Sequence, residues 1–316
     1  MLALTSMDWP ALGFQHELTL EAAGRRVRAV ITEVAAAIRH LSVDGVEITC
    51  GYPVDVRPPF SSGIVLAPWP NRVRDGRWTH KGRTQQLDIT EPDRGNALHG
   101  LLRNTPYRLV ERTGASVTLS AQVFPQSGYP FHLDTRVRYT LAHTGLEVTH
   151  TVRNVGSACA PVALGSHPFL TIGDVPADEL VLTVSADHHI DVDDRLNPIG
   201  VTPVDGTAWD LREGRVVGTL ELDDAWSGAT IVEGGSTHSL RAADGRTVSL
   251  WADEHYDYVQ VFITRVFPTA SGHVTAVAIE PMTAPADAFN SGEGLRWIDP
   301  GHDWSVSWAI RYLNPG

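Results

Sequence analysis

The stretch HLDTRVRYTLAHTGLEVTHTVR (residues 132–153) alternates apolar and polar side chains over most of its length. In the first half, one face of a strand would carry Leu133, Thr135, Val137, Tyr139 and Leu141, and the other would carry the charged Asp134, Arg136 and Arg138. Its second half repeats the pattern: Leu146, Val148 and Val152 against Glu147, Thr149 and Arg153. Successive side chains of a strand point to opposite faces, so a period of two residues indicates strands that are buried on one side. The stretch therefore predicts half-buried antiparallel strands.

The same period recurs elsewhere in the chain, at Val117, Leu119, Ala121 and Val123 and again at Trp304, Val306, Trp308, Ile310 and Tyr312. Turn signals containing glycine separate such segments: Asp44-Gly45, Asp75-Gly76, Thr113-Gly114, Asn154-Val155-Gly156, Asp205-Gly206 and Asp244-Gly245. The sequence has no linker-like segment and no internal repeat of the kind that solenoids and propellers show. It predicts an all-β protein, a large antiparallel β-sandwich, with residues 1–316 forming a single domain.

One window, EVAAAIRHL (residues 33–41), has the spacing of a helix. Its β-branched neighbours and the turn signal that follows at Asp44-Gly45 favour a strand at least as strongly. The sequence alone leaves the helix and the strand open at this point.

Composition limits the classes of function. Hydrophobic residues make up 42% of the 316 residues, which is enough for a large core. The formal net charge of −12, without a concentrated basic stripe, argues against nucleic acid as the main partner. No run approaches the roughly 18 apolar residues that span a membrane, and the N-terminal segment lacks the pattern of a secretory signal. We expect a cytoplasmic protein that binds neither nucleic acid nor a membrane.

The motifs of several enzyme classes are missing from the sequence. It has no phosphate-binding G-x-x-x-x-G-K-S/T loop, no G-x-G-x-x-G dinucleotide motif and no G-x-S-x-G elbow of the α/β-hydrolases. The segment ADHHIDVDD (residues 186–194) combines two histidines with four aspartates, but its spacing matches no metal site. We interpret this segment as a solvated acidic loop, and we expect neither a metal nor another cofactor.

Three chemically active side chains stand at the ends of apolar segments. His99 is followed by a glycine, while His167 and Glu280 are each followed by a proline. Glycine lets a backbone or a ligand approach closely, and proline prevents a strand ladder from continuing. Each residue alone is more commonly structural than functional. Together they suggest a cleft, because strand ends on one edge of a sandwich can converge.

The chain resembles the aldose 1-epimerase (mutarotase) family over nearly its whole length. Five segments carry the resemblance in the family's order: PNRVRDG (residues 70–76), ALHGLLRN (97–104), SHPFL (166–170), LDDAW (222–226) and IEPMTAPADAFNSGEGLRWIDPG (279–301). The resemblance implies a galactose mutarotase-like β-supersandwich with an open cleft for one monosaccharide. It also implies an isomerase that interconverts the α and β anomers of a free aldose without a cofactor.

The resemblance also implies roles for individual residues. Carried over by position, Glu280 resembles the general base and His167 the general acid. The residues similar to those that grip the sugar hydroxyls are His99, Arg72 and Asp223, with Asn71 beside them in the same motif.

The chemistry of such a reaction needs only acid and base groups. Ring opening removes the proton of the C1 hydroxyl and protonates the ring oxygen, and closure reverses both steps. Glu280 follows an apolar strand, so desolvation should raise the pKa of its carboxyl. The carboxylate should in turn favour a protonated His167 if the two share a cleft. Arg72 offers several N–H donors, enough to bind two vicinal hydroxyls, whereas Arg74 should be solvated or paired with an acid.

Some positions differ from galactose-type members, so the preferred sugar stays open. The sequence does not reveal the oligomeric state either. Ser166 replaces a common asparagine, and Phe169-Leu170 replaces Tyr-Phe. A hexose-6-phosphate 1-epimerase is one alternative function, and Arg103 is the cation that the sequence offers for it. A non-catalytic sugar-binding module is another, although a binder needs no acid and base together. The tryptophans near the motifs, Trp69, Trp78 and Trp226, are interpreted as core rather than as sugar-stacking residues.

Overall fold

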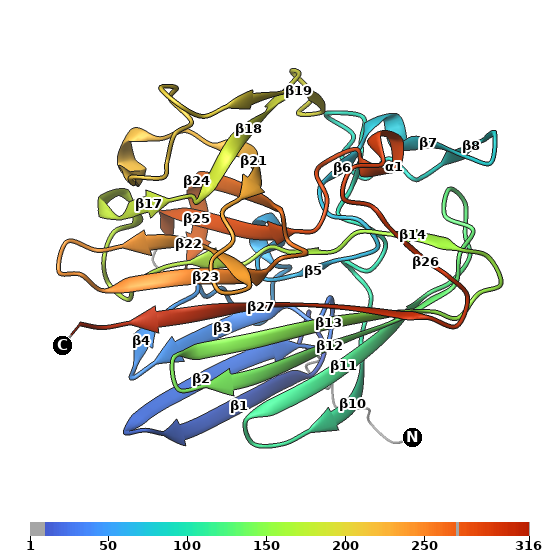
Figure 1. The fold of residues 1–316 in the computed structure, drawn as a ribbon. Helices are drawn as coiled ribbons and strands as arrows, with labels where there is room; N and C mark the ends of the chain where they lie inside the picture. Colours follow the sequence, from blue (N-terminus) through green and yellow to red (C-terminus); the bar gives the residue numbers. More distant parts are fainter. Residues whose placement is uncertain (1–9, 270–271, 316) are drawn as a thin grey trace, which may run out of the picture.

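The structure is a computed structural model that describes residues 10–269 and 272–315. Almost all of its regular structure is β-strand, and the named strands pair antiparallel (Figure 1). Within these ranges the α-helix α1 (Ala288–Ser291) has four residues, and no helix has the length and hydropathy needed to cross a bilayer. Four 3₁₀ turns are η1 (Pro59–Ser61), η2 (Arg74–Gly76), η3 (Ala177–Glu179) and η4 (Val217–Thr219). The prediction of an all-β antiparallel fold is confirmed.

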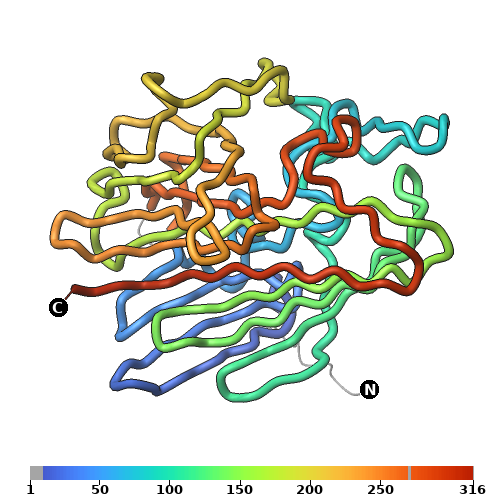
Figure 2. Tube along the Cα trace, viewed as in Figure 1, coloured from blue at the N-terminus to red at the C-terminus, as the bar shows by residue number. Residues whose placement is uncertain are grey.

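The largest sheet has nine strands and includes both strands predicted from residues 132–153. In sheet order they are β10 (Arg108–Arg112), β11 (Ser116–Val123), β12 (Leu133–Ala142), β13 (Gly145–Asn154), β27 (Asp303–Leu313), β23 (Thr247–Asp253), β22 (Gly235–Arg241), β17 (Val181–Thr183) and β20 (Arg215–Val216). Tyr139 lies opposite Val148, and the side chains predicted to face inward are buried on β12 and β13. In Figure 2, β27 is the red tube that runs between green β13 and orange β23.

The second sheet has eight strands, and its long strands β24 and β25 lie near its middle. Its strands are β19 (Pro198–Pro203), β18 (Ala186–Val192), β21 (Asp223–Ala229), β24 (Tyr258–Thr269), β25 (Gly272–Met282), β15 (Gly165–Ser166) and β5 (Val65–Leu66), with β16 (Phe169–Leu170) also paired to β25. β25 contacts β23, so this sheet packs against one part of the nine-stranded sheet.

A four-stranded sheet covers the other part of the nine-stranded sheet. It consists of β1 (Gln15–Ala22), β2 (Arg25–Thr32), β3 (Ile38–Val43) and β4 (Val46–Glu47). β1 and β2 contact β12, and β3 contacts β13. The nine-stranded sheet therefore packs against two partners, which extends an ordinary sandwich, and the apolar core lies between these layers. Three short pairs complete the strands: β6 (Arg72–Val73) with β9 (Ala97–Leu98), β7 (Arg77–His80) with β8 (Arg83–Gln86), and β14 (Ala160–Val162) with β26 (Arg296–Ile298).

The structure resolves the ambiguous window and corrects one prediction. Within residues 33–41, Ala35 and Ala36 have φ values of 60° and 48°, so they form a turn, and β3 starts at Ile38. The interpretation of residues 186–194 as a solvated loop is wrong, because most of them form β18. The reason is a buried histidine. The side chain of His189 is 3% exposed and pairs with two carboxylates, which offset the free-energy cost of its burial.

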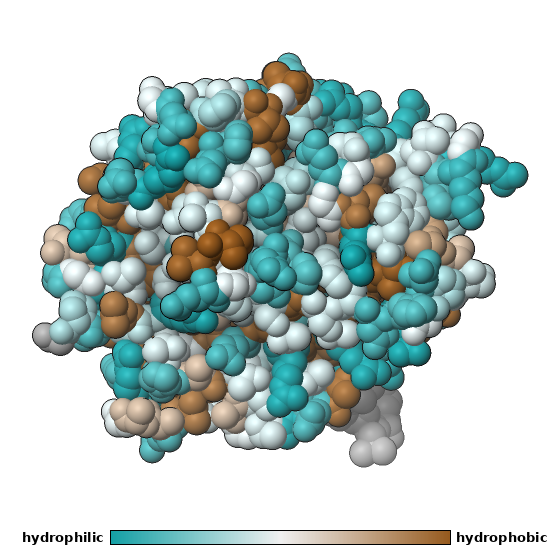
Figure 3. Space-filling model, in the orientation of Figure 1, coloured by the Kyte–Doolittle hydropathy of each residue, from teal (hydrophilic) through white to brown (hydrophobic). Residues whose placement is uncertain are grey.

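The molecular surface mixes hydrophilic and hydrophobic side chains. On the face shown in Figure 3, hydrophobic side chains form small groups among hydrophilic ones. Trp69, Trp78 and Trp226, by contrast, are buried in the core, as predicted. Small scattered apolar groups are normal on a folded protein and need no partner to explain them.

Candidate active site

Strand register brings two of the predicted residues together. β15 and β16 flank His167 and both pair with β25, and the register of these pairings puts His167 opposite Glu280. On the other side of β25, β24 places Gln260 opposite Glu280. Side chains opposite one another on adjacent strands lie on the same face of the sheet. The result is a direct contact, because His167 Nε2 lies 3.2 Å from Glu280 Oε1.

The β6–β9 pair supplies a second group of residues. The backbone N–H of His99 donates to the carbonyl of Asn71 at 2.9 Å, which places both beside Arg72. Asn71 and His99 have φ values of 54° and 61°, in the left-handed region that few residues adopt without strain. Gly100 follows with φ +73°, and a Cβ at this position would lie 2.1 Å from the carbonyl oxygen of Ala67. The close backbone approach predicted at Gly100 is confirmed.

All six predicted residues line one cavity of about 310 Å³. The residues around it are Phe60, Ser61, Asn71, Arg72, Arg94, Leu98, His99, His167, Asp223, Gln260, Phe262 and Glu280. A larger cavity of about 710 Å³ lies beside η3 and the end of β25 away from Glu280, and its lining includes none of the six. We take the smaller cavity as the candidate site, because the acid, base and hydrogen-bonding groups converge there.

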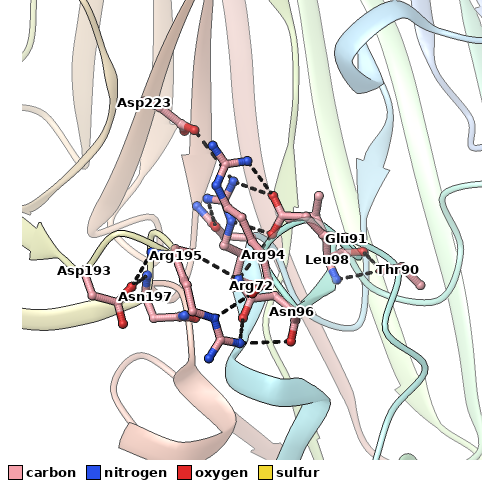
Figure 4. A network of polar contacts seen from close by, with 12 residues as sticks. Arg72, Thr90, Glu91, Arg94, Asn96, Leu98, Asp193, Arg195, Asn197 and Asp223 are labelled. Atoms are coloured by element: carbon pink, nitrogen blue, oxygen red, sulfur yellow. Dashed lines mark hydrogen bonds and ion pairs between the residues drawn. The ribbon is translucent and has the colours of Figure 1, made fainter.

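Arg72 is held in place by a carboxylate that the sequence did not reveal. Its Nε and Nη2 atoms donate to Glu91 at 2.9 and 3.0 Å (Figure 4). Its Nη1 donates to Asn71 Oδ1 at 3.2 Å. Nη2 also lies 3.7 Å from Asp223 Oδ2. A guanidinium has five N–H donors, so one remains on each terminal nitrogen. Three of the N–H donors that the sequence analysis assigned to a ligand are therefore already used within the protein, and Arg72 keeps two donors for a ligand.

Gln260 is a second residue that the sequence analysis missed. Its Oε1 accepts from Asn71 Nδ2 at 3.0 Å, and its Nε2 donates to Asp223 Oδ1 at 2.8 Å. It therefore joins Asn71, beside Arg72, to Asp223 across the cavity. A polar residue inside the apolar run YVQVF was the available signal. Glu91 offered no such signal, because its burial depends on its contact with Arg72, 19 residues away in the sequence.

Three buried polar atoms in the cavity residues are unpartnered. Among the described residues, Glu280 Oε2, His99 Nδ1 and His167 Nδ1 have no hydrogen-bond partner. The two imidazoles meet edge to face, with ring centroids 5.4 Å apart. Unsatisfied buried polar atoms are costly and rare, and they concentrate at functional sites. A small ligand with several hydroxyls would supply the missing partners.

Burial controls the protonation of the histidine and the glutamate. Burial, assisted by the negative charge of Asp223, raises the pKa of Glu280 well above its usual range, against the opposing charge of Arg72. Burial and the charge of Arg72 lower the pKa of His167 to about 4. The predicted rise for Glu280 is confirmed, but the prediction that His167 is protonated is wrong. Desolvation outweighs the attraction of the carboxylate, so burial favours the neutral form of both groups, a protonated Glu280 and an uncharged His167.

Two arginines differ in their relation to the cavity. Arg94 lines it, whereas Arg103, the cation proposed from the sequence, lines a different cavity. The prediction for Arg74 is confirmed in its second form: Arg74 pairs with Asp193 at 3.1 Å and with Asp287 at 3.7 Å.

Sequence comparisons relate the chain to enzymes that act on sugars. A family model described as aldose 1-epimerase matches residues 16–311. "Uncharacterized protein YihR" of Escherichia coli (strain K12) is 33% identical over 285 residues, which are 90% of this chain and 89% of that protein. Galactose mutarotase of Mus musculus is 34% identical over 167 residues, which are 50% of this chain and 47% of that protein.

Solved structures show the same fold at low sequence identity. A GalM/aldose epimerase homologue from C. elegans superposes with a TM-score of 0.82 and 17% identity, covering 96% of this chain and 100% of that one. A putative aldose 1-epimerase from Escherichia coli K12 gives a TM-score of 0.78 and 16% identity, covering 95% and 99%. The predicted galactose mutarotase-like supersandwich is confirmed.

Proposed function

The chain belongs to the aldose 1-epimerase family, and from this membership we propose that it is a mutarotase, an isomerase that interconverts the α and β anomers of a free aldose. The observation that carries the proposal is the contact of 3.2 Å between Glu280 and His167 inside a cavity of about 310 Å³. A cavity of this size suits one small molecule. The unpartnered atoms of the same residues are suited to hydroxyl and ring oxygens.

The proposed reaction moves two protons and breaks one ring bond. Glu280, as carboxylate, removes the proton of the C1 hydroxyl while His167, as imidazolium, protonates the ring oxygen. The bond from C1 to the ring oxygen breaks, and the C1 hydroxyl oxygen becomes an aldehyde carbonyl. Rotation about C1–C2 presents the other face, and the same two groups then close the ring in reverse roles. Each proton-transfer group contributes about 10²- to 10⁴-fold to such a rate.

The shared proton of the pair fits this cycle. Moving it from Glu280 to His167 across 3.2 Å creates the carboxylate and the imidazolium that ring opening uses. Ring opening then returns the pair to protonated Glu280 and neutral His167, which is the arrangement that burial favours. The number of protons on the pair is unchanged over the cycle, so no group outside the cleft has to exchange a proton with solvent.

The other cavity residues are proposed to bind the hydroxyls. Arg72 offers its two remaining donors, and Asp223 is a partly exposed acceptor beside it. Burial, assisted by the positive charge of Arg72, holds the pKa of His99 well below its usual range, so His99 acts as a neutral partner for a hydroxyl. Asn71 contributes mainly by its bonds to Arg72 and Gln260.

We expect a bell-shaped pH profile of kcat/KM. As the pH falls through the pKa of His167, about 4, the pair gains a second proton and the base is lost. As the pH rises through the raised pKa of Glu280, the pair loses its one proton and the acid is lost. The alkaline limb should therefore lie well above the ordinary pKa of a glutamate.

Steady-state rates between pH 3 and pH 10 check this prediction, with circular dichroism at each pH to exclude unfolding. An alkaline limb at or below the ordinary pKa of a glutamate would contradict the raised pKa of Glu280. A profile without either limb would contradict acid–base catalysis by this pair.

Polarimetry tests the proposed function itself. Fresh α-D-glucose and α-D-galactose should relax to their equilibrium rotation faster with the protein than with a boiled control. A non-catalytic binding module would bind the sugar without changing this rate. The proximity of an acid and a base argues against a module, because binding alone needs no such pair.

A second candidate, the epimerisation of a hexose 6-phosphate, is favoured by Arg94. This side chain lines the cavity, is 42% exposed and is bonded to Glu91 at 3.3 Å. A guanidinium binds phosphate well, although the carboxylate of Asp223 in the same cavity would repel it. Comparing kcat/KM for glucose and glucose 6-phosphate in the wild type and Arg94→Gln decides between them. A loss confined to the phosphorylated sugar would support this candidate.

The single domain predicted over residues 1–316 stays a prediction. Its main support is that one family model extends from residue 16 to residue 311.

A further inference from the structure

The turn Glu91–Asn96 carries residues that shape the cleft but belongs to no sheet. It is closed by its own backbone contacts, including the N–H of Asn96 on the carbonyl of Glu91 at 3.2 Å. Glu91 holds Arg72, and Arg94 lines the cavity. A short turn of this kind needs outside contacts to hold its side chains in one position.

Arg195, in the loop between β18 and β19, provides such contacts (Figure 4). Its Nε donates to the carbonyl of Arg94 at 2.7 Å, and its Nη2 lies 3.1 Å from the carbonyl oxygen of Gly95 and 3.4 Å from Asn96 Oδ1. Asn96 Nδ2 donates in return to the carbonyl of Arg195 at 3.0 Å. One guanidinium therefore holds three consecutive residues of the turn.

Gly95 makes this contact possible. Its φ is +65°, and a Cβ at this position would lie 3.0 Å from Arg195 Nη2. A larger residue would both strain the backbone and push the guanidinium aside. The loop around Arg195 is fixed as well, because Asp193 Oδ1 accepts the backbone N–H groups of Arg195 and Asn197 at 3.0 and 2.8 Å.

A short chain of hydrogen bonds leads from Arg195 to the cavity. Asn96 is bonded to Arg195 through both its side-chain oxygen and its side-chain nitrogen. The same nitrogen also donates to Glu91 Oε2 at 3.2 Å. Glu91 then binds Arg72 through both of its oxygens. We propose that Arg195 is a positioning residue for substrate binding, which fixes the Glu91–Asn96 turn so that Glu91 holds the guanidinium of Arg72 towards the sugar. This inference rests on the proposed function of the cleft.

The test compares Arg195→Gln with Arg212→Gln in the full chain, using D-glucose or D-galactose, whichever the wild type turns over. Arg212 is a matched control, since it also makes several bonds, to Asp187, Asp205 and Asp210, and does not line the cavity. Arg195→Gln should raise KM on the order of tenfold and leave kcat within about twofold, because ground-state and transition-state binding are weakened alike. Arg212→Gln should change neither constant.

Two further variants separate positioning from a general structural role. Gly95→Ala displaces the Arg195 guanidinium and should reproduce the rise in KM. In an Arg72→Ala background, Arg195→Gln should add no further rise, since its effect passes through Arg72. Additive effects, or an unchanged KM in a folded Arg195→Gln protein, would overturn the inference. A wild type that accelerates neither sugar would contradict the proposed function instead, so the two failures are distinct.

Discussion

Replacing Glu280 with glutamine is expected to lower kcat for anomer interconversion at least about 100-fold, since a general base contributes this much or more. The amide cannot accept the proton of the C1 hydroxyl. The fold should be kept, because burial already favours the neutral form of Glu280, and glutamine has the same shape. Sugar binding should be kept for the same reason. The measurement is polarimetry for kcat and calorimetry for sugar affinity.

Glu147→Gln is the matched control, because Glu147 lies on the exposed face of β13, and its rate should equal that of the wild type. A Glu280→Gln protein that keeps more than about a tenth of the wild-type rate would remove Glu280 from the mechanism.

Removal of the Arg72 side chain is expected to act on KM rather than on kcat. We propose that the two free donors of Arg72 bind hydroxyls, and a charged hydrogen bond to a neutral group is worth about 1.5–3 kcal/mol, or about 10- to 150-fold in kcat/KM. Arg72→Ala also removes two of the hydrogen bonds to Glu91, which is 12% exposed and keeps only those from Arg94 and Asn96, so a loss of thermal stability should accompany the kinetic effect. Steady-state polarimetry and thermal unfolding measure the two effects.

Arg74→Ala serves as the neighbouring control. Arg74 binds Asp193 and the carbonyl of Pro198 but does not line the cavity, so its loss should change kcat/KM by less than about twofold. If Arg74→Ala were the impaired enzyme and Arg72→Ala behaved as the wild type, the assignment of Arg72 to the substrate would be wrong.

The fold could be predicted where one sheet face is apolar. The alternation around Tyr139 and Val148 predicted both that these segments are strands and which of their side chains face the core, because the apolar residues of the pattern are the buried ones. The interpretation of residues 186–194 as a solvated loop failed for a physical reason. His189 looks solvated in the sequence, yet Asp191 and Asp224 neutralise it and allow its burial. A compensating residue 35 positions away leaves no local signal.

The sequence predicted which residues would lie together, but it did not predict their electrostatics. The motifs around Arg72, His99, His167 and Glu280 gave residues that line one cavity. The sequence could not give the protonation of the pair, which depends on how completely the fold excludes water. It could not give Glu91 or Arg195 either, because their importance arises from contacts between distant loops.

The most direct test of the central claim is exchange NMR on anomeric protons at equilibrium, with the wild type and Glu280→Gln measured side by side. Exchange between the α and β signals of D-glucose or D-galactose should increase in proportion to wild-type concentration. It should stay at the uncatalysed level with folded Glu280→Gln. No acceleration by the wild type for any free aldose, or equal acceleration by both proteins, would contradict the account.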